Sequence, residues 1–162
     1  MAHELSFRLV DTIERELPAL QAITQEQAGR IQAGNDGWSR LEELGHLIDS
    51  AANNHVRFAR AAIDGAYRGD TYKQNEWVKL HGYAGMSWEE LVEFWRRYNM
   101  VLARVIEQIP EERLSAECSI GSAAPVSLRF LIEDYVLHMQ HHLDHVLARE
   151  EMTQYPGAAV GV

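Results

Sequence analysis

The sequence predicts an all-α protein, and a four-helix bundle is the natural architecture for it. Apolar residues recur at three- and four-residue steps over long stretches, and few segments alternate with the period of two that half-buried strands require. Of the 162 residues, 46% are apolar and 24% are charged, which is typical of a globular protein that can bury its own core. We expect a single domain over residues 1–153, followed by a frayed tail at 154–162.

The first two helices are delimited by residues that stop a helix. The first is expected over residues 5–32, where Pro18 should kink or divide it, because proline lacks the N–H that the helix needs. A turn of glycine, asparagine and aspartate at 33–37 should end it. The second helix is expected over 39–63, and the pair Asp64-Gly65 should end it.

Two helix starts have the spacing of a capping box. Ser39 is followed three residues later by Glu42, and Ser87 by Glu90, so each serine and glutamate can satisfy a free N–H group of the first turn. The third helix is expected to start at Ser87 and to stop before Pro110, with its apolar residues at helical spacing.

The connections between these helices differ greatly in length. Residues 65–86 are expected to be irregular apart from one short helix at about 74–80, and a connection this long is often functional. Residues 110–126 are expected to form a loop, and the last helix should cover about 127–151. The expected bundle therefore has one long connection between its second and third long helices.

Charge and composition exclude several classes of function. The chain has 15 basic and 24 acidic residues, a net charge of −9, which argues against a nucleic-acid partner because acidic surfaces repel phosphates. No apolar run approaches the roughly 20 residues of a membrane span, so no membrane partner is expected. The start of the chain lacks the features of a signal peptide, and the lone Cys118 suits a reducing compartment, so a cytoplasmic location is expected.

Histidines are concentrated in the last predicted helix. The chain has eight, and four of them lie between positions 138 and 145. His138 with His142, and His141 with His145, have the i, i+4 spacing that can direct two imidazoles at one ion. On a helical wheel His138 and His142 border the apolar face, whereas His141 and His145 turn toward solvent. The first pair is therefore the candidate for a metal site, and a third ligand must come from elsewhere in the fold.

The remaining histidines leave the third ligand open. The candidates are His3, His46, His55 and His81. On the second helix, His55 shares the apolar face, so amphipathicity alone makes it the buried one, although a core histidine bonded to backbone is the commoner case. His46 lies on the opposite, polar face and can equally be an exposed histidine.

The polar face of the second helix has two interpretations. It carries Glu42, His46, Asp49, Asn53 and Arg57 at helical spacing. It is either a hydrated surface or the wall of a cleft, in which His46 is a ligand, Asp49 orients it and Arg57 contacts an anion. Spacing alone favours the hydrated surface.

Two segments resemble a known family. Residues 37–50 read GWSRLEELGHLIDS and residues 138–145 read HMQHHLDH. They are similar to the Gly-Trp-Ser/Thr…His-Leu-x-Asp-Ser and His-x-x-His-His-x-x-His stretches of the DinB/YfiT-like superfamily of bacterial four-helix-bundle proteins. The likeness extends over about 5–150 and is closest to the YfiT-type branch.

This resemblance implies a metal site and a range of activities. Carried over by position, the ligands of one divalent ion, zinc or nickel, would be His46, His138 and His142. The family includes metal-dependent hydrolases and thiol S-transferases that use low-molecular-weight thiols as cosubstrates. We therefore expect an enzyme with a small-molecule substrate, and a homodimer, since apolar faces of such bundles often pair.

Four other residues have expected roles in this hypothesis. Asp49 is expected to orient a ligand or act as a general base, while Asn53, Arg57 and Tyr72 would contact substrate. Cys118 is a poor candidate nucleophile because no histidine lies near it in sequence.

Two alternatives differ in class from a three-histidine enzyme. The chain can instead be a non-catalytic bundle that a metal ion stabilises, or a module that binds a small ligand. A ferritin-like site with two ions is set aside, because it needs two Glu-x-x-His pairs. Only Glu43 and His46 have that spacing.

Overall fold

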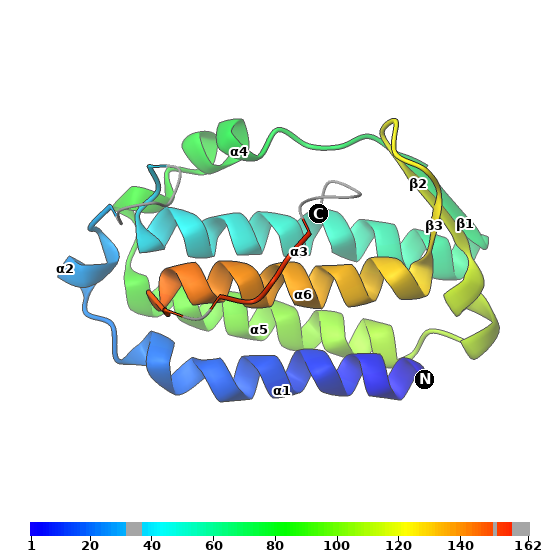
Figure 1. The fold of residues 1–162 in the computed structure, drawn as a ribbon, viewed down its shortest axis with the longest axis horizontal. Helices are drawn as coiled ribbons and strands as arrows, with labels where there is room; N and C mark the ends of the chain where they lie inside the picture. Colours follow the sequence, from blue (N-terminus) through cyan, green and yellow to red (C-terminus); the bar gives the residue numbers. More distant parts are fainter. Residues whose placement is uncertain (32–36, 151, 157–162) are drawn as a thin grey trace.

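Four long helices form the bundle that the sequence predicts. The computed structural model describes residues 1–31, 37–150 and 152–156. The long helices are α1 (Ala2–Gln21), α3 (Arg40–Asp64), α5 (Trp88–Glu107) and α6 (Leu128–Val146). Helix α1 packs against α5 and α6, and α3 packs against the same two helices, so the four enclose one core (Figure 1).

The first helix is shorter than the predicted 5–32. Helix α1 ends at Gln21, one turn after Pro18, and the short helix α2 (Gln25–Ala28) follows with Thr24 as its cap. Pro18 thus lies in the last turn, where it divides the segment and does not kink a continuing helix. Of the turn predicted at 33–37, only Gly37 belongs to the described residues, and it has a φ of +84°.

The second helix begins and ends where the sequence predicts. The Ser39 side chain accepts from the N–H of Glu42, and the Glu42 carboxylate accepts from the N–H of Ser39 at 2.8 Å, which completes the capping box. Gly65 ends α3 in the left-handed conformation, with a φ of +84°. At the start of α5, Ser87 accepts from the N–H of Glu90 at 3.4 Å, so half of the second predicted box is present.

The two connections that were expected to be irregular contribute a small sheet. Its strands are β1 (Ala66–Gly69), β2 (Glu117–Ile120) and β3 (Val126–Ser127). Strand β1 pairs with β2 in parallel, and β2 pairs with β3 antiparallel, at one end of the bundle (Figure 1). The connections also contain helix α4 (Gln74–His81), close to the predicted 74–80, and the 3₁₀ turns η1 (Tyr83–Gly85) and η2 (Glu111–Ser115).

The end of the chain lies along the bundle. Helix α6 stops at Val146 and not at the predicted 151. The Thr153 backbone N–H and hydroxyl donate to Asp144 Oδ2 at 2.7 and 2.5 Å, and the Tyr155 ring lies 5.5 Å from that of His138. Residues 152–156 of the tail are therefore attached to α6, and 157–162 lie outside the described residues.

Helix α3 is the most deeply buried element around the histidines. Every residue from 43 to 51 is buried, the polar ones included, because α5 and α6 cover one side of α3 while β1, α4 and η1 cover the other. The face that the sequence presents as a hydrated surface is thus an interior wall. Among the described residues, no helix is both long and apolar enough to cross a membrane.

Candidate metal centre

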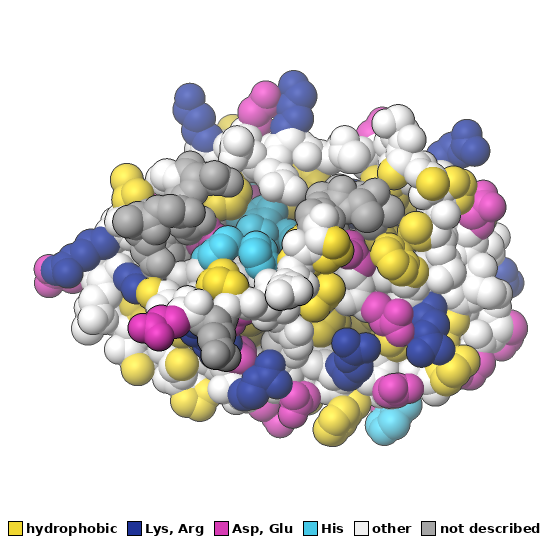
Figure 2. All heavy atoms as spheres, in the orientation of Figure 1, with side chains coloured by type: hydrophobic (Ala, Val, Ile, Leu, Met, Phe, Trp, Pro, Cys, Tyr) yellow, Lys and Arg dark blue, Asp and Glu magenta, His cyan; other side chains and the backbone are white. Residues whose placement is uncertain are grey.

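Three histidines from two helices meet inside the bundle. Helix α3 supplies His46, while α6 supplies His138 and His142. One ring nitrogen from each lies within 4.8 Å of the others, and His46 and His138 are buried. Histidine side chains reach the surface near the middle of the face shown in Figure 2. The structure therefore brings together the three residues that the resemblance selects.

The spacing of the ring nitrogens suits one ion. His46 Nε2 lies 3.3 Å from His138 Nε2. Two nitrogens bound to a tetrahedral zinc at about 2.05 Å stand about 3.3 Å apart. The ring of His142 lies 4.6 Å from that of His46 and 4.3 Å from that of His138, between centroids. Three imidazoles in this arrangement fit zinc or nickel and leave room for a further ligand.

Burial keeps the imidazoles of His46 and His138 neutral. Burial and, to a lesser extent, the neighbouring His142 lower the pKa of His46 to about 3, while Glu43 opposes the shift. Burial also holds the pKa of His138 well below its usual range. Neutral rings keep the nitrogen lone pair that a metal ion requires, so these two histidines are in the metal-binding form near pH 7.

The sequence analysis missed a buried glutamate beside this group. Glu43 is fully buried one turn before His46, and its Oε1 accepts a hydrogen bond from Nδ1 of His142. His145 Nδ1 lies 3.2 Å from the same oxygen. The signal in the sequence is the three-residue spacing of Glu43 and His46, which places the two side chains on the same side of a helix.

Three further histidines are partly buried, so a helical wheel describes their surroundings incompletely. His55, which it places on the apolar face, is only half-buried, with Nδ1 3.3 Å from the Tyr98 hydroxyl. His145 and His141, which it turns toward solvent, are both partly buried. Parts of the chain that are distant in sequence cover two of these rings. Glu43 of α3 lies against His145, and the Thr153 carbonyl of the tail lies 3.0 Å from His141 Nδ1.

Asp49 lies one turn after His46 and makes its described contacts with the long connection. Its Oδ1 accepts from the Tyr83 hydroxyl at 2.7 Å and lies 2.9 Å from His81 Nδ1. Its Oδ2 is buried and has no hydrogen-bond partner among the described residues. Burial raises the pKa of Asp49, and the contacts with Tyr83 and His81 oppose the shift.

The three predicted substrate contacts lie further along the same wall. Asn53 donates to the Asp49 carbonyl at 2.9 Å, and the buried Arg57 donates to Asn54 Oδ1 at 3.4 Å. Burial raises the pKa of Tyr72, an effect that nearby Asp49 increases and Arg57 opposes, so this phenol lies in the field of both charges. The structure thus arranges Asp49, Tyr72 and Arg57 as neighbours.

Cys118 has the properties of a packed core residue. It is buried in β2, with its Sγ 3.7 Å from the Ala116 carbonyl. Burial raises the pKa of its thiol to about 11, which leaves little thiolate near neutral pH. This agrees with the expectation that Cys118 is not a nucleophile.

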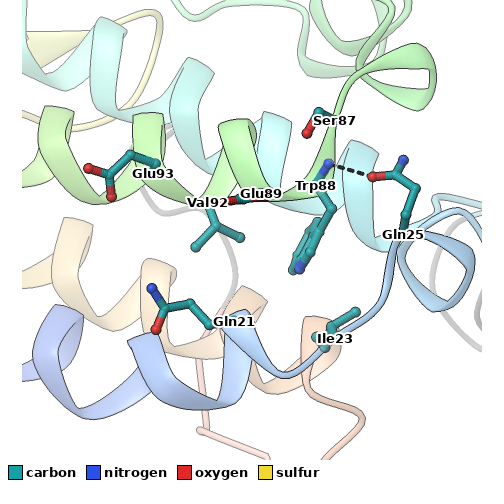
Figure 3. A pocket seen from close by; sticks show the side chains of 8 residues that line it. All are labelled: Gln21, Ile23, Gln25, Ser87, Trp88, Glu89, Val92 and Glu93. Atoms are coloured by element: carbon teal, nitrogen blue, oxygen red, sulfur yellow. Dashed lines mark hydrogen bonds between the residues drawn. The ribbon is translucent and has the colours of Figure 1, made fainter.

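Two cavities lie on different sides of the bundle. One of about 600 Å³ lies between the end of α1 and the start of α5, where Gln25 Oε1 accepts from the Trp88 N–H at 2.6 Å (Figure 3). Its lining includes Glu89 and Glu93 but none of the histidines. The other, of about 540 Å³, is lined by His141 and residues 152–156, beside the three-histidine group. The lining of the second cavity contacts the group through His141, whose ring lies 5.5 Å from that of His142, and Tyr155, whose ring lies 5.5 Å from that of His138.

Comparison with known proteins agrees with this fold. The family model of the DinB superfamily matches residues 8–146, so the chain belongs to the DinB superfamily. The solved structure of YfiT from Bacillus subtilis, described as a probable metal-dependent hydrolase with an unusual four-helix bundle topology, has the same fold. The two align with a TM-score of 0.79 and 17% identity over 91% of this chain and 86% of YfiT. No curated protein sequence matches the chain.

Proposed function

We propose that this protein is an enzyme that depends on one divalent metal ion, zinc or nickel, held by His46, His138 and His142. The observation that carries the proposal is the convergence of three ring nitrogens within 4.8 Å, two of them on buried residues. Three neutral imidazoles hold a divalent ion and leave a coordination position open, as in catalytic rather than structural sites. The description of YfiT as a probable metal-dependent hydrolase supports the same class of activity.

The chemistry proposed is hydrolysis or transfer of a low-molecular-weight thiol to a small electrophile. An ion with an open position makes a water or thiol more acidic and polarises a carbonyl, which serves both reactions. Asp49 Oδ2, buried and without a partner among the described residues, would accept the proton as general base. Tyr72 and Arg57 would contact an anionic group of the substrate, with Asn53 at the edge of the same wall.

A specific observation also favours a non-catalytic role as the second candidate. The proposed ligands come from α3 and α6, so an ion would tie these two helices together and stabilise the bundle. The coordination of the ion separates the two candidates. A fourth ligand from the protein favours the structural role, and a bound water or thiol favours the enzyme.

The first test is the metal content of the purified protein, followed by an activity screen. We expect about one equivalent of zinc or nickel per chain by elemental analysis. Pairs of thiols and electrophiles, and a panel of esters and amides, would then be screened before and after chelation. Turnover that stops on chelation and returns when the ion is added back supports the proposal. A wild-type chain without metal, or turnover that is indifferent to chelation, contradicts it.

We also propose that the protein is a cytoplasmic homodimer that pairs through α3 and α5. Val56 and Ile63 on α3, and Phe94 and Val101 on α5, are exposed at seven-residue spacing beside a groove of about 470 Å³. A second copy related by a two-fold axis would cover the same apolar side chains on both partners. The lone buried Cys118 suits the reducing cytoplasm.

Sedimentation equilibrium tests the dimer. We expect a species of twice the 18.5 kDa chain mass, and a monomer for Val101→Asp, because the aspartate places a charge in the apolar contact. Glu107→Ala, an exposed change on the same helix outside the patch, is the control. A wild-type species of 18.5 kDa rules out the dimer.

A further inference from the structure

Glu43 stands out because a carboxylate without exposure to water needs partners. Its side chain is fully buried in the second turn of α3. Burying a charged carboxylate costs several kcal/mol unless hydrogen bonds compensate. The described contacts of Glu43 Oε1 are with two imidazoles of α6, Nδ1 of His142 and Nδ1 of His145. In these two contacts the buried carboxylate faces histidine side chains.

The direction of the bond to His142 fixes which nitrogen of that ring can bind metal. An ionised carboxylate only accepts hydrogen bonds, so with Glu43 charged the proton of this bond is on Nδ1 of His142. The lone pair is then on Nε2, on the opposite side of the ring, and the rings of His46 and His138 lie 4.6 and 4.3 Å away.

His142 differs from the other two histidines in this respect. The Nδ1 atoms of His46 and His138 are buried and have no hydrogen-bond partner among the residues that the structure describes. His46 and His138 are also almost fully buried, so packing holds their rings. The side chain of His142 is 18% exposed and lies at the rim, so the hydrogen bond to Glu43 restrains a ring that is less tightly enclosed than the other two.

We propose that Glu43 is a positioning residue that holds His142 in the tautomer and orientation that the metal site requires. This inference rests on the proposed three-histidine site. The effect is that of a carboxylate behind a histidine ligand, which raises the basicity of the ligand and removes the freedom of its ring to rotate. His145 Nδ1 also lies 3.2 Å from Glu43 Oε1, as a second and longer contact of the same oxygen.

The test measures metal affinity in variants that differ in whether the side chain at position 43 can accept a hydrogen bond from His142. Cobalt(II) is the probe, because its visible absorption reports the geometry of its ligands, and a competing chelator gives the dissociation constant. We expect Glu43→Leu, which removes the acceptor and keeps the bulk, to bind cobalt 10–100-fold more weakly, about the range for loss of such a partner. Glu43→Gln, whose side-chain oxygen still accepts from Nδ1, should restore most of the affinity and the wild-type spectrum.

Matched controls separate this role from a general loss of stability. Glu16→Gln removes another buried carboxylate, which pairs with Arg15 and Arg149 away from the three histidines, and should leave cobalt affinity unchanged. Thermal melts of each variant after chelation show whether it folds. Glu43→Met is a second variant without an acceptor, should Glu43→Leu fold poorly. His145→Ala keeps the bond between Glu43 and His142 and should bind cobalt nearly as well as wild type.

The outcomes distinguish failure of the proposed metal-dependent function from failure of the proposed role of Glu43. A wild-type chain that binds no cobalt contradicts the proposed function itself. A wild-type chain that binds cobalt, together with wild-type affinity in folded Glu43→Leu or Glu43→Met, overturns only the role of Glu43. Equal losses in Glu43→Leu and Glu43→Gln also overturn it, because a retained acceptor would then make no difference.

Discussion

His142→Ala should remove most of the metal bound by the protein. Of the three ring nitrogens within 4.8 Å, two would remain, and two imidazoles hold a divalent ion poorly. The change lies at the rim of the site, so the bundle itself should still fold. Elemental analysis should find about one equivalent in the wild type and little in the variant. Wild-type metal content in His142→Ala would contradict the assignment of His142 to the metal site.

Two histidine-to-alanine controls make this result specific. His3 is exposed at the start of α1, with Nδ1 3.3 Å from a Glu107 oxygen, so His3→Ala applies the same chemical change far from the site. His141 is the immediate neighbour of His142 but does not belong to the three-nitrogen group. Both variants should keep their metal, and a loss in either would mean that histidines hold the ion nonspecifically.

Gly45→Ala should destabilise the protein although alanine favours helices. A Cβ at Gly45 would overlap ring carbons of Tyr83, whose hydroxyl donates to Asp49 at 2.7 Å, one turn further along α3. The ring must move, which loses that charge-assisted bond and leaves the carboxylate buried. Overpacking costs about 1–3 kcal/mol and the lost bond about 1.5–3, against a gain in helix propensity of about 1. We expect the free energy of unfolding in urea to fall by about 2 kcal/mol.

A double-mutant cycle shows whether the contact with Tyr83 is the cause. In a Tyr83→Ala background the ring is gone, so Gly45→Ala should become neutral or stabilise the protein by up to about 1 kcal/mol. Gly85 lies in η1 with open space around its Cβ position, so Gly85→Ala should change stability by less than about 0.5 kcal/mol. A loss of about 2 kcal/mol that persists without the Tyr83 ring would contradict this explanation.

Local signals in the sequence predict the helices well. The Ser39–Glu42 capping box and Gly65 set both ends of α3 within a residue of the prediction, because caps depend on the backbone groups of a single turn. The strands β1 and β2 were missed because each is four residues long and pairs with a partner far away in sequence. Their stability comes from that pairing, which periodicity within one segment does not contain.

The site could be predicted only in part, and for a related reason. The spacing of His138 and His142 identifies the pair on α6, because both proposed ligands lie on one helix face. Periodicity favours His55 over His46 on α3, since it distinguishes only apolar from polar faces. The segment from β1 to η1 covers the polar face and buries His46, so the choice depends on tertiary packing. The resemblance to a family selected His46, because members of a family share their tertiary packing and the motif therefore reflects it.

The proposed site would also tie metal loading to the course of folding. His46 and His138 are 92 residues apart in the chain and lie on different helices. A chain in which only neighbouring segments have come together therefore has no place for the ion, and bringing α3 and α6 together closes a long loop at an entropic cost. An ion that binds only the finished arrangement stabilises that state alone and slows its opening. Capture of the ion would then report that α3 and α6 have come together.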